Sequence, residues 1–380
     1  MKNPADSDFC TVTAPEACAM LGISRDTLYA YVSRGLVRTI AHPDDARRSL
    51  YDRRDIESLS TRKRRGRSRR AVAESTINWG EPILTSKITR IADGRFYYRG
   101  KDAVVLSRTV TLEAALILLA GVHMRSPYSS VADRPMKEER TPFDRILLEM
   151  ARQAVGSRGG DGRPRAGELM RLTALAASSG SDRPDLPMHQ LLSRAWCNNP
   201  SAADLMRRAL VLCADHELNA STYAARVAAS AGASLPAALL AGLSTLSGTG
   251  HGGITTRCRR WMDDVESRAR QSVPDVATDG TPPPGFSHPL YPDGDPRAAE
   301  LLTHIGISDR WQRIVEEVHR RTGSHPSLDF ALAMLERRLR LVEGAALGIF
   351  AVGRMAGWLA HIFEQRRSGR LIRPRAQTGG

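Results

Sequence analysis

The sequence predicts a mainly α-helical protein in which a small helical module precedes a larger helical body. Composition supports this class, because alanine, leucine and arginine are abundant while aromatic residues make up only 5% of the chain. Strand-like alternation is scarce after residue 110. The 380 residues suit two or three domains, and an apolar fraction of 42% is sufficient for a sizeable core.

Residues 11–37 carry the pattern of two short helices joined by a glycine turn, the helix-turn-helix arrangement. Gly22 is expected to end the first helix and Ser24 to cap the second. The apolar positions that form one face across both helices are Ala17, Leu21, Leu28 and Tyr31. The second helix would expose side chains of the kinds that reach base edges or phosphates, namely Arg25, Asp26, Tyr29 and Arg34.

A short basic strand at 47–51 and a helix from Asp52 are expected next. With Arg48, Tyr51 and Asp55, this segment resembles the winged helix-turn-helix of the MerR and excisionase type. The resemblance implies a domain at 1–60 with duplex DNA as a partner. Its candidate DNA-binding residues are Arg25, Tyr29, Arg34, Arg47 and Arg48. The alternative is a small helical module that docks on the rest of the protein and binds nothing.

The charge of the chain favours polyanionic partners. The formal net charge is +14, which suits nucleic acid or phosphorylated cofactors. The segment TRKRRGRSRR, residues 61–70, contains seven basic residues in ten. Such a run is typical of a solvated linker or of an arm that binds phosphates. We therefore expect the domain boundary here, with a basic linker over 61–76.

The cysteines argue against a disulfide framework and against a structural zinc site. The five are scattered, and they form no Cys-x-x-Cys pair. No apolar run is expected to reach the length of a membrane span, and the N-terminus MKNPADSDF lacks the apolar core of a signal peptide. We expect a soluble cytoplasmic protein without a membrane partner.

The body after residue 77 contains the residue types of an acid/base site. A hairpin is predicted around Asp93 and Gly94, and a helix from Thr111. Three histidines, His216, His251 and His288, lie in polar or glycine-rich turns. A carboxylate can abstract a proton beside a carbonyl, histidines can polarise carbonyl oxygens, and arginines can hold a dicarboxylate. This inventory fits carbon–carbon bond formation through an enol without a metal, although a lone histidine is more often structural.

Residues 77–380 resemble the citrate synthase family. The motifs that carry the resemblance are ADHELNASTYAAR at 214–226, GHGG at 250–253, PGFSH to DPR at 284–297, LDF at 328–330, GRMAGW at 353–358 and IRPR at 372–375. The resemblance implies an all-α homodimer whose subunits have two domains with the active site in the cleft. The large domain would comprise 77–251 and 341–380, and the small domain about 252–340.

The resemblance also implies the reaction, the condensation of oxaloacetate with acetyl-CoA and water to give citrate and CoA. It makes Asp329 the base, His251 the partner of the thioester oxygen and His288 the proton donor to the ketone. The residues that it assigns to oxaloacetate are His216, Asn219, Arg297, Arg354 and Arg373, the last contributed across the dimer interface. No permanently bound cofactor and no metal are implied, since acetyl-CoA is a co-substrate.

Departures from the family pattern surround one histidine. Ser287 stands where the family usually has glycine, and Pro289 follows the histidine. Propionyl-CoA, which would give 2-methylcitrate, is the alternative substrate, because one methylene changes binding by only about 1–3 kcal/mol. A further alternative is a DNA-binding regulator whose body senses oxaloacetate or acyl-CoA.

Overall fold

The chain forms two compact units, an N-terminal unit (Met1–Thr85) and a C-terminal unit (Ser86–Gly380). The computed structural model describes residues 11–33, 36–42, 45–65, 84–121, 140–156, 165–180, 183–197, 199, 202–267 and 280–374. Arg34 and residues 66–76 of the expected linker lie outside the described residues, and so does the side chain of Arg47.

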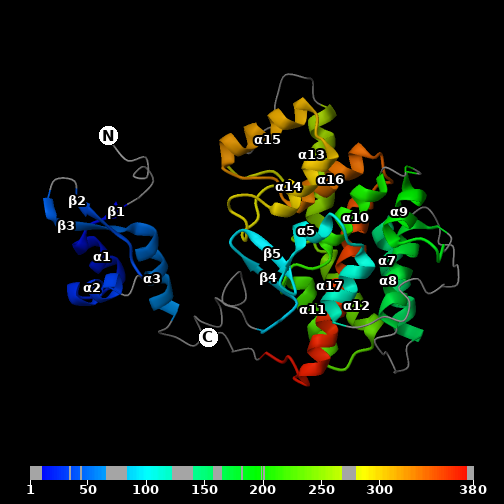
Figure 1. Cartoon of the computed structure of the whole chain (residues 1–380), viewed down its shortest axis with the longest axis horizontal. Helices are drawn as coiled ribbons and strands as arrows, with labels where there is room; N and C mark the ends of the chain where they lie inside the picture. The colour runs from blue at the N-terminus through cyan, green and yellow to red at the C-terminus, as the bar shows by residue number, and fades with distance from the viewer. Residues whose placement is uncertain are drawn as a thin grey trace, which may run out of the picture. The chain divides into compact units, whose positions relative to one another are not determined.

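The N-terminal unit combines short helices with a small antiparallel sheet (Figure 1). Its described elements are β1 (Thr11–Val12), α1 (Ala14–Leu21), α2 (Arg25–Ser33), β2 (Thr39–His42), β3 (Asp45–Asp52) and α3 (Arg53–Arg65). The strand order in the sheet is β1-β3-β2. A separate core forms around Leu28 and Ile56, which are both fully buried. The unit therefore has its own small hydrophobic interior.

Local signals explain where the helices of this unit begin and end. Gly22 ends α1 in the left-handed conformation, with φ of 58°, as expected. The Ser24 Oγ accepts a hydrogen bond from the backbone N–H of Thr27, 3.4 Å away, at the start of α2. Helix α3 continues through Arg65, so the first half of the basic run, residues 61–65, is helical. Arginine and lysine are good helix formers, and a helix already anchored by Ile56 propagates readily into them.

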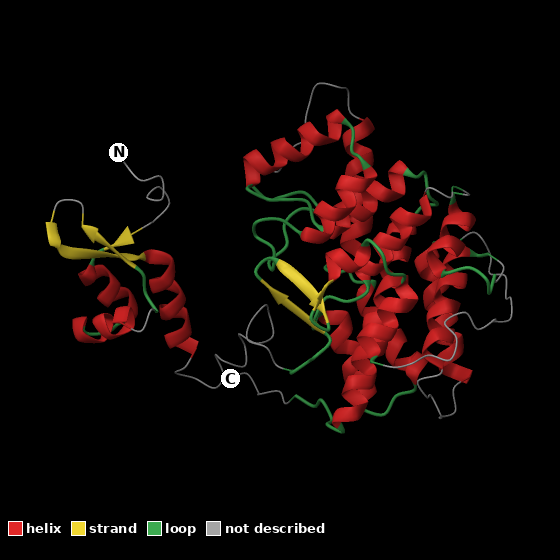
Figure 2. Ribbon diagram, viewed as in Figure 1, coloured by secondary structure: helices red, strands yellow, loops and turns green. Residues whose placement is uncertain are grey.

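The C-terminal unit is almost entirely helical (Figure 2). Its hairpin strands are β4 (Thr89–Ala92), β5 (Arg95–Tyr98) and β6 (Lys101–Asp102), paired in that order. Its described helices are α5 (Ala103–Ser107), α6 (Leu112–Ala120), α7 (Pro142–Gly156), α8 (Arg165–Ser178), α9 (Met188–Trp196), α10 (Ala202–Cys213), α11 (Ala220–Ser230), α12 (Leu235–Leu246), α13 (Gly253–Ser267), α14 (Pro296–Ile305), α15 (Asp309–Thr322), α16 (Leu328–Arg338) and α17 (Ala345–Ser368). The expected hairpin turn at Asp93–Gly94 and the helix after Thr111 are both present.

Helix α17 is the central helix of the C-terminal unit. It packs against α6, α10, α11 and α12 and against α7, α8 and α16 (Figure 1). Among the described residues it is long and apolar enough to cross a membrane, so the expectation that no apolar run reaches that length was wrong. An 18-residue apolar stretch of α17 is 94% buried inside the unit, as expected for a core helix. A helix enclosed on all sides is apolar all round, and this explains the pattern.

Two glycines let α17 approach the end of α10 closely. A Cβ on Gly353 would lie 2.6 Å from Cys213 Cβ, closer than real side chains come. The backbone N–H of Gly357 donates to the carbonyl of Ala214 at 2.8 Å. This contact fixes the turn after α10 against the middle of α17, where the predicted site residues begin to meet.

Candidate active site

The C-terminal unit gathers six of the predicted residues into one region. The central site consists of His216, His251, His288, Arg297, Asp329 and Arg354, from the α10–α11 turn, the turn before α13, the loop before α14 and helices α14, α16 and α17. The charges of Arg354, Arg297 and Asp329 all act on the buried thiol of Cys213, whose pKa burial raises to about 12. Segments more than a hundred residues apart in sequence thus share one electrostatic environment.

His216 lies in the turn between α10 and α11. Its Nε2 forms a 2.8 Å hydrogen bond with the hydroxyl of Tyr291. Glu217, the next residue, has a positive φ of 56°, and Asn219 caps α11 by accepting from the N–H of Thr222 at 3.0 Å. Burial lowers the pKa of His216 well below its ordinary value, and the positive charge of Arg297 adds to this effect. His216 is therefore a neutral imidazole at neutral pH.

His251 is presented by a tight glycine turn. A Cβ on Gly252 would lie 2.6 Å from the carbonyl oxygen of Leu246, so this position requires glycine. The Nε2 of His251 lies 2.8 Å from the hydroxyl of Ser221, which is itself 2.7 Å from Asn219 Oδ1. Burial, helped by the charge of Arg354, lowers the pKa of His251 to about 4. The predicted Asn219 therefore reaches the site through Ser221.

His288 lies in a loop that is fixed by backbone hydrogen bonds. The N–H of Ser287 donates to the carbonyl of His325 and the N–H of Ser327 donates to that of Gly285, both at 2.8 Å. Ser287 has a positive φ of 70°, a conformation that favours glycine and explains why glycine is usual in the family pattern.

The same loop determines the tautomer of His288. Its Nδ1 accepts a 3.2 Å hydrogen bond from the backbone N–H of Leu290. Burial, together with the charge of Arg297, lowers the pKa of His288 to about 4, so the ring is neutral at neutral pH. A neutral imidazole that accepts at Nδ1 carries its proton on Nε2. His288 is thus a hydrogen-bond donor through Nε2.

Arg297 is held by a buried carboxylate at the start of α14. Asp295 caps this helix and accepts from Arg297 Nε at 2.9 Å and from Nη2 at 2.8 Å. Burial alone would raise the pKa of Asp295, but the Arg297 guanidinium holds it below its ordinary value. Asp295 also accepts the backbone N–H of Leu328 at 3.0 Å, which ties α14 to α16. Arg297 is therefore rigidly oriented before any ligand binds.

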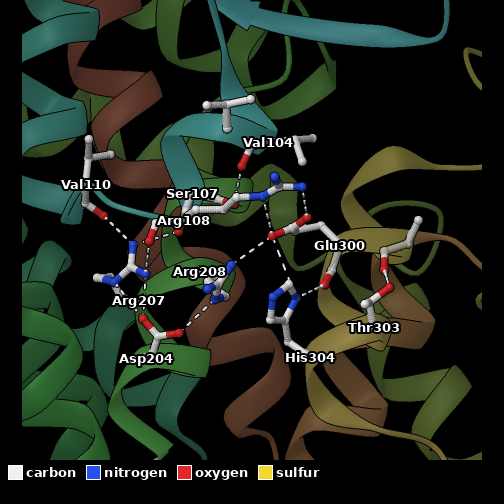
Figure 3. A network of polar contacts seen from close by, with 12 residues as sticks. Val104, Ser107, Arg108, Val110, Asp204, Arg207, Arg208, Glu300, Thr303 and His304 are labelled. Carbon is white, nitrogen blue, oxygen red and sulfur yellow. Dashed lines mark hydrogen bonds and ion pairs between the residues drawn. The ribbon is translucent and has the colours of Figure 1, made fainter.

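A network of charged side chains fixes α14 against α5 and α10 (Figure 3). Glu300, one turn after Arg297, is almost fully buried. Its carboxylate accepts hydrogen bonds from Arg108 at 2.9 Å and from Arg208 at 2.8 Å. Arg208 also pairs with Asp204 at 2.8 Å. Since α10 leads directly to the turn of His216, this Glu300 network helps to set the distance between Arg297 and His216.

Arg354 is a buried charge of the central site, on α17. It is only 1% exposed, and its Nε donates to the carbonyl of Cys213 at 2.8 Å. In the described part of the chain its two Nη nitrogens make no hydrogen bond, although the guanidinium lies 4.9 Å from the ring centre of Phe350. Burial lowers the pKa of Arg354, yet an arginine remains protonated at neutral pH. A buried guanidinium with an open fork is suited to binding a carboxylate.

Asp329 lies in the first turn of α16. Its Oδ1 accepts a 2.5 Å hydrogen bond from the hydroxyl of Thr255, a buried residue of α13. Burial raises the pKa of Asp329 to about 6, against the opposing effect of the Thr255 hydrogen bond. At neutral pH the carboxylate is therefore ionised but more basic than an ordinary aspartate, as a general base requires.

Arg373 is not brought to the central site of its own chain. It is exposed, and it follows α17 in a segment held by the hydrogen bond from Ile372 N–H to Ser230 Oγ, 3.1 Å. Among the described residues, no hydrogen bond or ion pair joins it to the six residues of the central site.

The described DNA-binding candidates lie on the surface of the N-terminal unit. Arg25 and Tyr29 are exposed on α2, and Tyr29 is 54% exposed. The Arg48 side chain on β3 is 75% exposed and pairs with Asp45 at 3.3 Å. Arg38, in contrast, is occupied by a bidentate contact with Asp55 and an ion pair with Asp52.

Sequence reasoning missed several partners of the central site. They are Asp295, Tyr291, Ser221 and Thr255. Asp295 and Tyr291 lie in the same PGFSH-to-DPR stretch as His288, and Thr255 follows the glycine turn by less than one helical turn. Their positions were visible, but only the packing of α13, α14 and α16 shows which site residue each one contacts.

The fold and site define a mainly helical protein with a buried cluster of histidines, arginines and an aspartate, and comparison with known proteins identifies its family. The family model described as citrate synthase, C-terminal domain, matches residues 166–375, more than half of the chain. The chain therefore belongs to the citrate synthase family.

Individual relatives agree with this family. The citrate synthase of Haloferax volcanii is 35% identical over 195 residues, which are 48% of this chain and 52% of that protein. Citrate synthase 2 of Bacillus subtilis is 34% identical over 194 residues, with the same shares. The chain thus spans about half the length of these curated relatives.

Solved structures show the same fold. The citrate synthase of Thermotoga maritima has a TM-score of 0.66 at 22% identity, over 79% of this chain and 94% of that one. A ternary complex of the Thermoplasma acidophilum citrate synthase with carboxymethyl coenzyme A and oxaloacetate has a TM-score of 0.65 at 20% identity, with the same shares.

Proposed function

We propose that the C-terminal unit condenses acetyl-CoA with oxaloacetate and water to give citrate and CoA. The observation that carries the proposal is the ionisation pattern of the central site. A carboxylate that ionises near pH 6, Asp329, shares its environment with neutral histidines and with the open guanidinium of Arg354. Removing a proton next to a thioester requires such a base, and stabilising the enol requires neutral donors.

In the proposed mechanism, Asp329 removes a methyl proton from acetyl-CoA while His251 hydrogen-bonds the thioester oxygen. The enol carbon attacks the ketone carbon of oxaloacetate, and the C=O π bond opens. His288 donates through Nε2 to the ketone oxygen as the new bond forms, in agreement with its tautomer. Water then hydrolyses citryl-CoA to citrate and CoA. The proton that this step releases returns to Nε2 of His288, and Asp329 gives up the methyl proton to solvent. His216, Arg297 and Arg354 hold the oxaloacetate carboxylates, with Asn219 nearby.

The proposed assembly has two domains per chain and two chains per active protein. A small domain of about 252–340, containing α13 to α16, would close on a large domain of 77–251 and 341–380. Support comes from the packing of α13 and α14 against α16 (Figure 1). Arg373 would reach the site of the other chain, in keeping with its exposure and its anchored backbone.

Product analysis tests the reaction. The full chain is incubated with oxaloacetate and either acetyl-CoA or propionyl-CoA, and both free CoA thiol and the organic acid are quantified. Oxaloacetate-dependent release of CoA with formation of citrate is the expected result. Higher kcat/KM with propionyl-CoA and formation of 2-methylcitrate would change the substrate but not the chemistry. No release of CoA from a folded protein that binds oxaloacetate would contradict the proposal and favour a sensor.

We propose, as a second function, that the N-terminal unit binds duplex DNA as a MerR-like winged helix-turn-helix domain. The exposed side chains of Arg25, Tyr29 and Arg48, on α2 and β3, support this proposal. The test is a salt titration of duplex binding by the full chain, by a double Arg25→Ala, Arg48→Ala variant and by an Arg53→Ala control.

A plot of the logarithm of the binding constant against the logarithm of salt concentration has a negative slope. In the double variant this slope should be smaller in magnitude by about two, one for each lost phosphate contact, while Arg53→Ala should give the parent slope. Because the whole chain is basic, only this difference reports on the N-terminal unit. Equal binding by the double variant and the parent would contradict a role for this surface.

A further inference from the structure

Tyr291 contacts three residues of the central site, His216, His288 and Arg297, but has no role in the mechanism proposed above. The residue is only 2% exposed, and its hydroxyl lies 2.8 Å from Nε2 of His216. Its ring lies 5.1 Å from the ring of His288, and the guanidinium of Arg297 is 5.4 Å from its centre. Tyr291 therefore joins the loop of His288 to the turn of His216.

Both partners of this hydrogen bond are neutral. Burial raises the pKa of Tyr291 well above its ordinary value, so the phenol keeps its proton. Burial lowers the pKa of His216 well below its ordinary value, so its ring is neutral and carries a single N–H. The bond between them has two arrangements: Tyr291 donates to a bare Nε2, or a protonated Nε2 donates to the phenol oxygen.

The chemistry of the ligand selects between these arrangements. Nε2 is already engaged by Tyr291, whereas Nδ1 of His216 makes no hydrogen bond in the described part of the chain. An oxygen of a dicarboxylate that reaches Nδ1 needs an N–H there, because two lone pairs repel. A neutral ring protonated at Nδ1 has a bare Nε2, which must accept from Tyr291.

We propose that Tyr291 is a positioning residue: it donates its hydroxyl proton to Nε2 of His216 and so keeps Nδ1–H available to an oxygen of oxaloacetate. This inference rests on the proposed function, since it takes a dicarboxylate as the ligand. Because Tyr291 and His216 come from separate segments, the bond also orients the two segments before the ligand arrives.

Tyr291→Phe tests the proposal with little change in packing, since the ring against His288 and Arg297 is retained. Calorimetry should show that oxaloacetate binds about tenfold more weakly, the equivalent of one lost hydrogen bond between neutral groups. KM for oxaloacetate should rise by a similar factor, and kcat should change less than about threefold. The matched control is Tyr97→Phe, whose ring faces Arg90 on the hairpin and should leave both values unchanged.

The tautomer itself gives a readout that a merely structural role would not move. The 15N shifts of the His216 ring should show a protonated Nδ1 in the parent protein and a mixture of tautomers in Tyr291→Phe. A second pair of variants imitates one ring nitrogen each. His216→Asn places an amide N–H near Nδ1 and should bind oxaloacetate more tightly than His216→Gln, which imitates Nε2.

The outcomes separate the two proposals. A parent protein that fails to bind oxaloacetate would overturn the proposed function. A parent that binds it, with Tyr291→Phe binding equally well or His216 protonated at Nε2, would overturn this inference alone.

Discussion

Replacement of Thr255 by valine should move the pH dependence of turnover to higher pH. The Thr255 hydroxyl donates to Asp329 at 2.5 Å and stabilises the ionised carboxylate, whose pKa is about 6. A hydrogen bond to a charged group contributes about 1.5–3 kcal/mol, and about 1.4 kcal/mol corresponds to one pKa unit. Valine keeps the shape but removes the donor. The pKa of Asp329 should therefore rise by about 1–2 units, to about 7–8.

The assay is kcat/KM for acetyl-CoA between pH 5 and 10, at saturating oxaloacetate. In the parent, activity should fall as the pH drops through about 6, because the base becomes protonated. The acid limb of Thr255→Val should lie about 1–2 units higher, and the two profiles should converge at high pH. Thr256→Val, an exposed neighbour on α13, is the matched control and should not move the limb. An unchanged limb, or one displaced to lower pH, would refute the assignment of Asp329 as the titrating base.

Three further predictions concern packing, charge and assembly. Gly285→Ala should lower the free energy of unfolding by about 2–4 kcal/mol in urea titrations, because φ is +89° and the new Cβ would lie 2.5 Å from Cys258 Sγ. The control is Gly232→Ala, where φ is +82° and the space around the new Cβ is open. It measures the backbone part of the cost alone and should lower the free energy of unfolding by only about 1–2 kcal/mol. Glu300→Gln should destabilise by about 1–3 kcal/mol, because the amide cannot neutralise Arg208, and an unchanged urea midpoint would show that the Glu300 network contributes nothing. Mixing inactive Arg373→Ala and Asp329→Asn chains should restore about a quarter of the parent activity, because a mixed dimer holds one site with both residues intact. No recovery after subunit exchange would contradict the contribution of Arg373 across the interface.

Candidate residues of the central site could be selected from the sequence, whereas their chemical states could not. His288, Arg297 and Asp329 could be selected because the short motifs around them resemble those of the citrate synthase family. The proton on Nε2 of His288 could not, since it depends on the backbone N–H of Leu290 two residues further on. The bidentate partner of Arg297 was equally hidden, although Asp295 stands only two residues before it.

The fold shows the same division between local and non-local information. The caps at Gly22 and Thr111 were predictable, because each depends on a side chain or glycine at one position. The expectation that no apolar segment reaches the length of a membrane span was wrong for α17. This helix is apolar on every face because other helices enclose it on all sides, and that packing is not visible in the sequence. The proposed role of Arg373 depends on a second chain, and the arrangement within one chain carries no information about it.

The most direct test of the account is to compare the parent protein with Asp329→Asn in two measurements on the same samples, oxaloacetate binding and CoA release. Asparagine keeps the size of the side chain but cannot accept the methyl proton. The account predicts that Asp329→Asn binds oxaloacetate with nearly the parent affinity and releases CoA at least about a thousandfold more slowly. Near-normal turnover by Asp329→Asn would contradict the central claim that this carboxylate starts the reaction.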